Sequence, residues 1–324
     1  MNKNLSAKEL NDISTSFQEI KEAIGRLIVG NDELIELLFI GLLSGGHVLI
    51  EGVPGTAKTT LVKTMAALTG CEFQRVQCAV DTQPADIIGI RFWNQQSGEF
   101  TLRRGSVFTN ILLIDEVNRL PPKSQSAFIE AMSERQATID GTTIAIDEPY
   151  FAIATQNPYE QEGTFPLIEA QKDRFMFSFH SRYMDREFER ELIRREHEGA
   201  LDWKEFTSQL MPLTNRQDLL AFIETAKRVH ISEPIQDYIG DLVIATRTHS
   251  DIHLGASSRG SIALVRGSKG WAAMNNRDYV IPDDVKKVAT FALKHRILPQ
   301  REAEISGITS TQIIEEILRT VEVP

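Results

Sequence analysis

The chain has 324 residues, of which 42% are hydrophobic and 25% are charged, and its formal net charge at pH 7 is −10. This composition is typical of a globular protein of two domains, and the acidic balance argues against a general nucleic-acid-binding protein. Only two cysteines, a polar N-terminus and no apolar run long enough to span a bilayer exclude a disulfide framework, a signal peptide and a membrane span, so we expect a soluble, cytoplasmic protein.

Short apolar runs alternate with helical patterns in the first half of the chain. This alternation predicts an α/β core with a parallel five-stranded sheet between helices. Several of the runs are almost continuously apolar, as strands covered on both faces usually are. The predicted strands are His47–Glu51, Phe73–Gln77, Asn110–Asp115, Tyr150–Thr155 and Phe175–His180.

Helical patterns replace the strands after about residue 185. Thr214 with Gln217 resembles a capping box that opens a helix over 216–230. Further helices are predicted from Ser232, over 283–295 and over 309–321. We therefore predict a nucleotide-binding core over residues 1–200 and a smaller, all-helical domain over 201–324.

A phosphate loop is indicated by the segment 52–59, which follows the first predicted strand and precedes a helical run from Thr60 to Leu68. In such a loop, backbone N–H groups and the positive end of the next helix bind phosphates. Lys58 would reach the β- and γ-phosphates, and the Thr59 hydroxyl would bind Mg²⁺. An ordinary turn is the alternative, but the flanks favour the phosphate loop. The candidate binding residues are Gly52, Val53, Pro54, Gly55, Thr56, Ala57, Lys58, Thr59 and Thr60.

Ala57 stands where a phosphate loop usually has glycine. Alanine carries a Cβ atom, so this residue must have a negative φ or accept strain.

Polar side chains follow two of the predicted strands at their carboxyl ends, where sheets of this class bind ligands. Asp115 would hold Mg²⁺, and Glu116, pointing the other way along the strand, would act as general base on the attacking water. Asn157 would hold that water or the γ-phosphate at the tip of another strand. A strand that ends in a polar turn is the alternative, which the position after a phosphate loop disfavours.

Several stretches between about residues 28 and 298 resemble the MoxR family of AAA+ ATPases. They are 51–55 with 57–59, 114–119, 121–123, 130–132, 154–158, 162–164, 169–171 with 173–175, 255–257 with Arg259, and 277–280. Ala57 is typical of that family, whereas Lys172 and Ser258 depart from its pattern.

The resemblance implies an ATP-hydrolysing motor that needs ATP and Mg²⁺ and works as a homo-oligomeric ring, a hexamer. It implies that Arg174 is an arginine finger, which reaches the ATP of the neighbouring subunit. It also implies that Arg259 is a second sensor, which closes the helical lid onto the γ-phosphate, and that Val29 and Gly30 line the adenine pocket. Without the resemblance, surface salt bridges would be the expected role of both arginines.

Two hairpins are predicted, over 90–103 with a turn at Ser97-Gly98 and over 137–146 around Asp140-Gly141. In the clade that contains this family, such hairpins project towards the ring pore and contact the client; plain extensions of the sheet are the alternative. The resemblance further implies protein clients that are remodelled, activated or loaded, and partners that carry a von Willebrand factor A domain.

Two other functions stay open. The first is a nucleotide-switched assembly module with little turnover, which the presence of Glu116 and Arg174 disfavours. The second is a DNA-linked AAA+ ATPase, which the acidic charge disfavours.

Overall fold

The computed structural model describes residues 5–96, 98–160, 162–199 and 210–324. Its centre is a five-stranded parallel sheet in the order β2-β5-β8-β1-β9. The strands are β1 (Val48–Gly52), β2 (Phe73–Gln77), β5 (Ile111–Asp115), β8 (Phe151–Gln156) and β9 (Phe177–Ser181). All five predicted strands are therefore confirmed, with ends that shift by no more than two residues.

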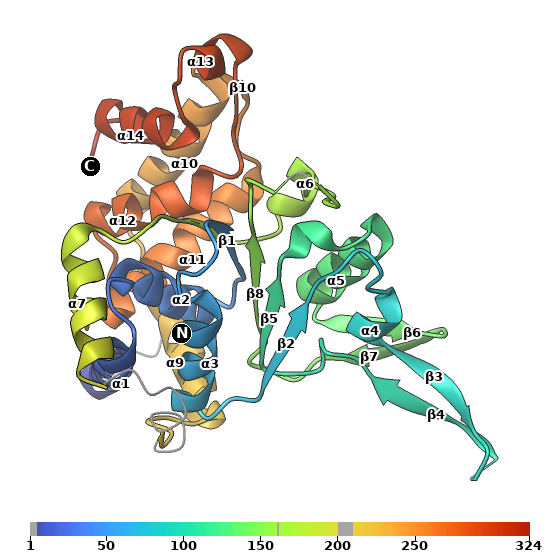
Figure 1. Cartoon of the computed structure of the whole chain (residues 1–324). Helices are drawn as coiled ribbons and strands as arrows, with labels where there is room; N and C mark the ends of the chain where they lie inside the picture. The colour runs from blue at the N-terminus through green and yellow to red at the C-terminus, as the bar shows by residue number, and fades with distance from the viewer. Residues whose placement is uncertain (1–4, 97, 161, 200–209) are drawn as a thin grey trace.

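Alternate side chains of the central strands enter two different hydrophobic clusters. On β5, Ile111 and Leu113 belong to the cluster that includes Leu34 of α2 (Asp32–Leu43) and Leu61 of α3 (Lys58–Leu68). Leu112 and Ile114 belong to the cluster of α5 (Pro122–Glu134) on the opposite face. Both faces of the sheet are thus covered, which explains the continuous apolar runs (Figure 1).

The N-terminal helix α1 (Ala7–Leu27) was not predicted. Its start is fixed by a capping box, in which the Ser6 side chain accepts from Glu9 N and the Glu9 carboxylate accepts from Ser6 N. Its apolar side chains recur every three or four residues and face α2, α3 and the helices of the second half. They are Leu10, Ile13, Phe17, Ile20, Ile24 and Leu27.

The second half of the chain is helical, as predicted. Its helices are α7 (Arg186–His197), α9 (Arg216–Arg228), α10 (Glu233–Thr248), α11 (Ser258–Met274), α12 (Pro282–Leu293), α13 (Arg301–Ile305) and α14 (Ser310–Thr320). One short antiparallel pair, β10 (Ile252–Leu254) with β11 (Leu298–Pro299), lies among them. The predicted boundary at residue 200 lies outside the described residues, so the division into 1–200 and 201–324 stays a prediction.

One predicted helix cap was wrong by a residue. The N-cap of α9 is Asn215, whose side chain accepts hydrogen bonds from Gln217 N at 2.9 Å and Asp218 N at 3.1 Å. Thr214 is buried instead.

Of the helices in the described ranges, none is long and apolar enough to cross a bilayer.

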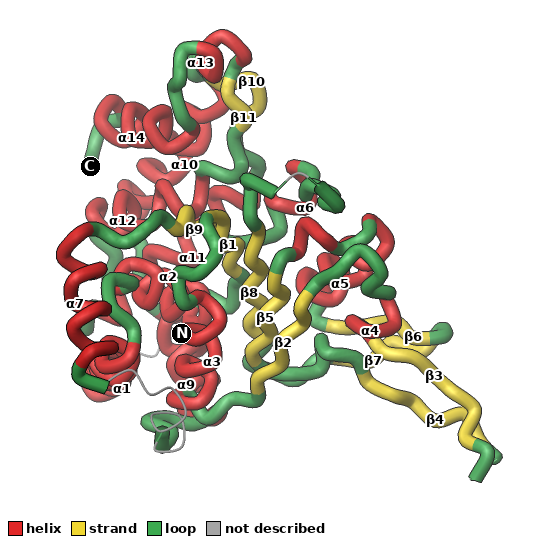
Figure 2. The backbone as a smooth tube through the Cα atoms, viewed as in Figure 1, coloured by secondary structure: helices red, strands yellow, loops and turns green. Residues whose placement is uncertain are grey.

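Both predicted hairpins are present: β3 (Gly89–Asn94) with β4 (Glu99–Arg104), and β6 (Gln136–Ile139) with β7 (Thr142–Ala145). Figure 2 shows β3 and β4 extending away from the body of the molecule, while Ser97 at the turn lies outside the described residues. After Gly105 the chain forms turns that lead into β5. A Cβ atom on Gly105 would lie 2.3 Å from the Ile87 carbonyl oxygen, because the hairpin closes directly onto the end of α4 (Pro84–Ile88).

Candidate functional site

A cavity of about 410 Å³ lies at the carboxyl ends of β1, β5 and β8, beside the start of α3. Its lining includes the predicted loop residues except Val53, which is buried, together with Asp115, Glu116 and Asn157. The complete set is Gly52, Pro54, Gly55, Thr56, Ala57, Lys58, Thr59, Thr60, Arg75, Gln77, Asp115, Glu116, Thr155, Gln156 and Asn157. The structure therefore brings most of the predicted site together in one place.

The loop between β1 and α3 depends on two unusual backbone positions. Gly52 has φ 136°, and a Cβ atom there would lie 2.1 Å from the carbonyl oxygen of Ser181, so glycine allows β1 and β9 to end side by side. Ala57 has φ 57° and ψ 19° and therefore accepts the strain that the sequence anticipated. α3 begins directly afterwards at Lys58 and has no acidic residue in its first turn, so its free N–H groups keep their positive potential.

Lys58 is held by the loop itself. Its Nζ donates to the carbonyl oxygens of Val53 at 2.7 Å and Gly52 at 3.2 Å. Burial lowers the pKa of Lys58, and the charge of Asp115 opposes that shift. The amino group is therefore tied to the backbone of the loop that presents it.

Asp115 is the centre of the polar contacts in the cavity. Its carboxylate accepts from Thr59 Oγ1 at 3.2 Å and Thr155 Oγ1 at 2.5 Å, and pairs with Arg75 Nη2 at 2.7 Å. The Thr59 hydroxyl and the Asp115 carboxylate thus supply adjacent hard oxygen atoms. This donor set fits Mg²⁺, which prefers oxygen ligands.

Glu116 occupies a different position from the one expected. β5 ends at Asp115, and Glu116 has φ 60° and ψ 52°, so it no longer follows the alternation of the strand and lines the same cavity as Asp115. The N–H of Glu116 donates to Thr155 Oγ1 at 2.9 Å, which holds this turn in place. Its carboxylate accepts from Gln77 Nε2 at 3.0 Å and pairs with Arg119 Nε at 3.1 Å.

Four further residues of this cavity were not predicted as functional: Arg75, Gln77, Thr155 and Gln156. Gln77 lies opposite Asp115 in the register of β2 and β5. Arg75 lies two residues earlier on β2 and therefore on the same face. The sequence held one signal for Arg75 and Gln77. They are polar residues at alternate positions of a strand, and the neighbouring strand ends in carboxylates.

Asn157 follows β8 and lines the cavity as predicted. Its Oδ1 accepts from Tyr159 N at 3.1 Å, which leaves the Nδ2 donor available to a ligand. Asn118, in the short helix η1 (Val117–Arg119), donates from Nδ2 to the carbonyl oxygen of Asn157 at 3.3 Å. The turns after β5 and β8 are therefore tied to each other.

Arg174 and Arg259 lie outside this cavity. They line another one, of about 290 Å³, near the link between α6 (Glu169–Lys172) and β9. Arg174 is exposed, and Arg259 pairs with Asp173 at 3.0 Å while its side chain stays 53% exposed. The expected closure of Arg259 onto the γ-phosphate is not the arrangement within this subunit, and the roles of both arginines stay predictions.

Arg296 fixes the segment that presents Arg174, a contact that no sequence signal revealed. Its guanidinium is buried, pairs with Asp173 at 3.0 Å and donates to the carbonyl oxygens of Met176 at 2.9 Å and Phe175. Burial lowers the pKa of Arg296 to about 10, so the side chain remains charged at neutral pH. The backbone beside Arg174 is thus anchored to the end of α12.

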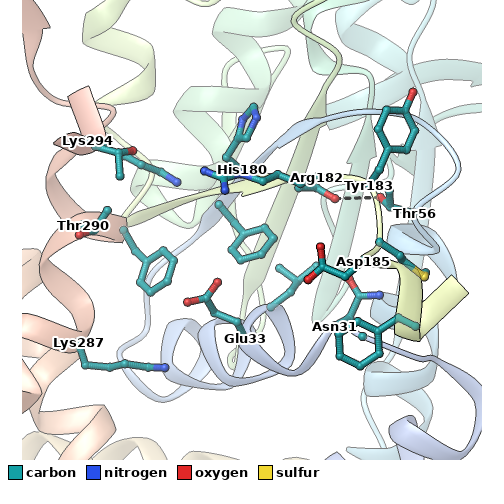
Figure 3. A pocket seen from close by; sticks show the side chains of 18 of the residues that line it. Asn31, Glu33, Thr56, His180, Arg182, Tyr183, Asp185, Lys287, Thr290 and Lys294 are labelled. Atoms are coloured by element: carbon teal, nitrogen blue, oxygen red, sulfur yellow. Dashed lines mark hydrogen bonds between the residues drawn. The ribbon is translucent and has the colours of Figure 1, made fainter. Parts of the chain in front are cut away.

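A further cavity of about 510 Å³ adjoins the phosphate loop and lies between the start of α2, the end of β9 and the helices α12 and α14 (Figure 3). Thr56 lines both cavities, so they are neighbours. Gly30 lines the cavity of about 510 Å³, as expected for an adenine pocket. Val29 is buried and does not line it; its carbonyl oxygen accepts from Asn31 Nδ2 at 3.2 Å.

The fold and the site define the AAA+ class. The features are a parallel sheet, a phosphate loop after β1, two carboxylates at the end of β5, a polar tip on β8 and a helical second half. Comparison with known families agrees. Residues 47–177 match the profile described as the ATPase family associated with various cellular activities (AAA), and residues 244–317 match that of the AAA lid domain.

Similar proteins span nearly the whole chain. It is 40% identical to the uncharacterized protein YeaC of Bacillus subtilis, over 94% of this chain and 93% of that protein. It is 39% identical to the chaperone MoxR1 of Mycobacterium tuberculosis, over 98% of this chain and 84% of that protein. A crystal structure of a protein assigned as an ATPase, from Cytophaga hutchinsonii, is 43% identical, covers 98% of this chain and 97% of its own, and has a TM-score of 0.89. The chain belongs to the MoxR family of AAA+ ATPases.

Proposed function

We propose that this protein is an ATP-hydrolysing motor, which works as a ring and remodels, activates or loads other proteins. The observation that carries the proposal is the position of Glu116, which lines the same cavity as Lys58 and Thr59. A carboxylate placed beside a phosphate loop and a Mg²⁺ ligand set can take a proton from water that attacks a γ-phosphate. A loop that only bound nucleotide would not need it.

Each side chain of the cavity has a defined task in this proposal. When bound, Mg²⁺ offsets the charge of the phosphates, and Thr59 and Asp115 would hold it. Lys58 would leave the carbonyls of Gly52 and Val53 and bind the β- and γ-phosphates. Asn157 would orient the attacking water through Nδ2, and Glu116 would accept its proton.

Assembly would complete the site. Arg174 is exposed and lines a different cavity from the phosphate loop of its own subunit, so it would be available to a neighbouring one. An arginine supplied by a neighbour is worth about 10³–10⁵ in rate in related phosphoryl-transfer enzymes. Arg259 lines the same cavity and would act at the same interface. Head-to-tail contacts of this kind close into a ring, for which we propose six subunits.

The hairpin β3–β4 is the proposed contact for protein clients. Its side chains Phe92, Trp93 and Phe100 are 44%, 54% and 68% exposed. Exposed aromatic side chains on a projecting element mark an interaction surface more often than a plain extension of the sheet. Partners that carry a von Willebrand factor A domain are proposed from the family likeness alone.

ATP turnover measured across protein concentration tests the proposal. We expect specific activity that rises with concentration and is lost in Glu116→Gln, while Glu130→Gln, an exposed substitution on α5, keeps it. A chain that hydrolyses no ATP at any concentration would overturn the proposal. Turnover that stays low and does not change with concentration would instead support a nucleotide-switched module.

A further inference from the structure

Lys294 is a cation in the cavity of about 510 Å³ that forms no ion pair with any described residue. It follows the last turn of α12, and Figure 3 shows it directed towards His180 and Arg182. In the part of the chain that the structure describes, Lys294 forms no ion pair, and its Nζ lies 5.7 Å from the centre of the Phe291 ring. Carboxylates act on this half-buried ammonium group, but among the described residues none lies close enough to pair with it.

Charged groups from several elements face Lys294. Glu51 at the end of β1 and Glu33 in α2 favour its charged form, whereas Arg182 after β9 opposes it. His180 on β9 and Glu315 on α14 line the same cavity. Burial outweighs the two carboxylates and lowers the pKa of Lys294 to about 8.

Lys287 offers a comparison within the same helix and the same cavity. Its Nζ pairs with Glu36 at 2.9 Å and lies 4.9 Å from the centre of the Trp271 ring. Glu36 also pairs with Lys21 at 2.9 Å, so it would keep a partner without Lys287. The charge of Lys287 is therefore neutralised within the protein, and that of Lys294 is not.

The surroundings of Lys294 fit a nucleotide that extends from the phosphate loop. Thr56 joins the two cavities, and its Oγ1 accepts from Ser181 Oγ at 3.0 Å beside the end of β9. The rings of Phe179 and Phe291 stack at 6.2 Å between centroids and give an apolar wall for a base. The unpaired cation in this cavity would meet the negative part of the same ligand.

We propose that Lys294 binds the phosphate chain of the nucleotide held by its own subunit, and so supplies the contact between helical lid and nucleotide that Arg259 does not make within the subunit. This inference rests on the proposed function. It assigns Lys294 and Arg259 to two different nucleotides. Lys294 binds the nucleotide of its own subunit, and Arg259 acts at the interface with the neighbouring subunit.

The proposal predicts how nucleotide affinity depends on pH. A bound phosphate favours the charged form of Lys294, so its pKa is higher in the complex than in the free protein. Binding then takes up a proton where free Lys294 is neutral, and affinity falls as pH rises above about 8. We expect roughly tenfold weaker binding at pH 9 than at pH 7.

The experiment is calorimetric titration of the full chain with ADP and Mg²⁺ between pH 7 and pH 9.5. The variants are Lys294→Arg, which stays charged throughout, Lys294→Met, and the control Lys286→Met, a lysine of α12 that does not line this cavity. Lys58, whose pKa is also lowered, is present in all of them, so its contribution cancels in the comparison.

We expect Lys294→Arg to keep the affinity at pH 7 and to lose less affinity than the wild type at pH 9. Lys294→Met should bind roughly tenfold more weakly at pH 7, with the shallower pH profile of Lys294→Arg, and Lys286→Met should follow the wild type. If Lys294→Met binds ADP with the affinity and pH profile of the wild type, this inference is wrong and the proposed function stands. If the wild type binds no ADP at any pH, both are wrong.

Discussion

Gln77 Nε2 donates a hydrogen bond of 3.0 Å to the carboxylate of Glu116. Arg119 pairs with the same carboxylate at 3.1 Å and with Glu160 at 2.8 Å. The proposed general base is therefore engaged by one hydrogen-bond donor, Gln77, and one cation, Arg119, of its own subunit. In the proposed mechanism at least one of them must release the carboxylate, which makes the observed arrangement a resting state of the site.

Removal of one donor should increase turnover. A hydrogen bond of this kind contributes about 1 kcal/mol, so we expect Gln77→Ala to raise kcat for ATP by up to about fivefold with KM unchanged. Gln74→Ala, an exposed glutamine on the same strand, is the control and should have no effect. Steady-state kinetics measure both; a lower kcat in Gln77→Ala would show that Gln77 positions the base instead of restraining it.

The sheet and most of the site were predictable because their signals are local. β5 reads as an apolar run ending in Asp115, and the phosphate loop is contiguous, so strand, loop and helix follow from neighbouring residues. The turn at Glu116 was not predictable, because Thr155 on another strand holds it. Arg296 escaped prediction for the same reason: its partners around Asp173 are distant in sequence.

Arg277, in the stretch 277–280 that resembles the family, has a structural role that the amino-acid sequence did not reveal. It pairs with Asp284, which is 1% exposed and also accepts from Ile281 N at 2.9 Å at the start of α12. Arg277→Ala would leave a buried carboxylate without its cation and should lower the free energy of unfolding by roughly 2–3 kcal/mol. Lys286→Ala, whose pair with Asp283 is exposed, should lower the free energy of unfolding by less than about 0.5 kcal/mol. Urea unfolding measures both variants. Equal losses in both variants would refute this role.

His47 should make the protein less stable in acid. It is buried, its Nδ1 accepts from Ala152 N at 3.0 Å, and its Nε2 donates to the Met132 carbonyl oxygen at 2.9 Å. Burial, aided by the charge of Arg135, lowers its pKa to about 4. The unfolded chain, with a pKa of about 6.5, takes up the proton more readily, so stability falls as pH drops from about 6.5 towards 4, by up to about 3 kcal/mol.

Urea unfolding at pH 7 and pH 4 tests this linkage by comparing the wild type with His47→Gln. The carboxylates also titrate in this pH range, and burial lowers the pKa of His295 as well. These groups are present in both proteins, so the difference between the two losses of stability is due to His47. We expect a smaller loss in His47→Gln, and the same loss in both proteins would exclude the effect.

The central claim is that one subunit supplies Glu116 and its neighbour supplies Arg174 to the same ATP. Arg174→Ala and Glu116→Gln should each abolish turnover when assayed alone. In an equal mixture, about a quarter of the interfaces would combine an intact cavity with an intact arginine, so turnover should return to roughly that fraction of the wild-type rate. A mixture as inactive as its two components would contradict the account, because each subunit would then need both residues for its own site.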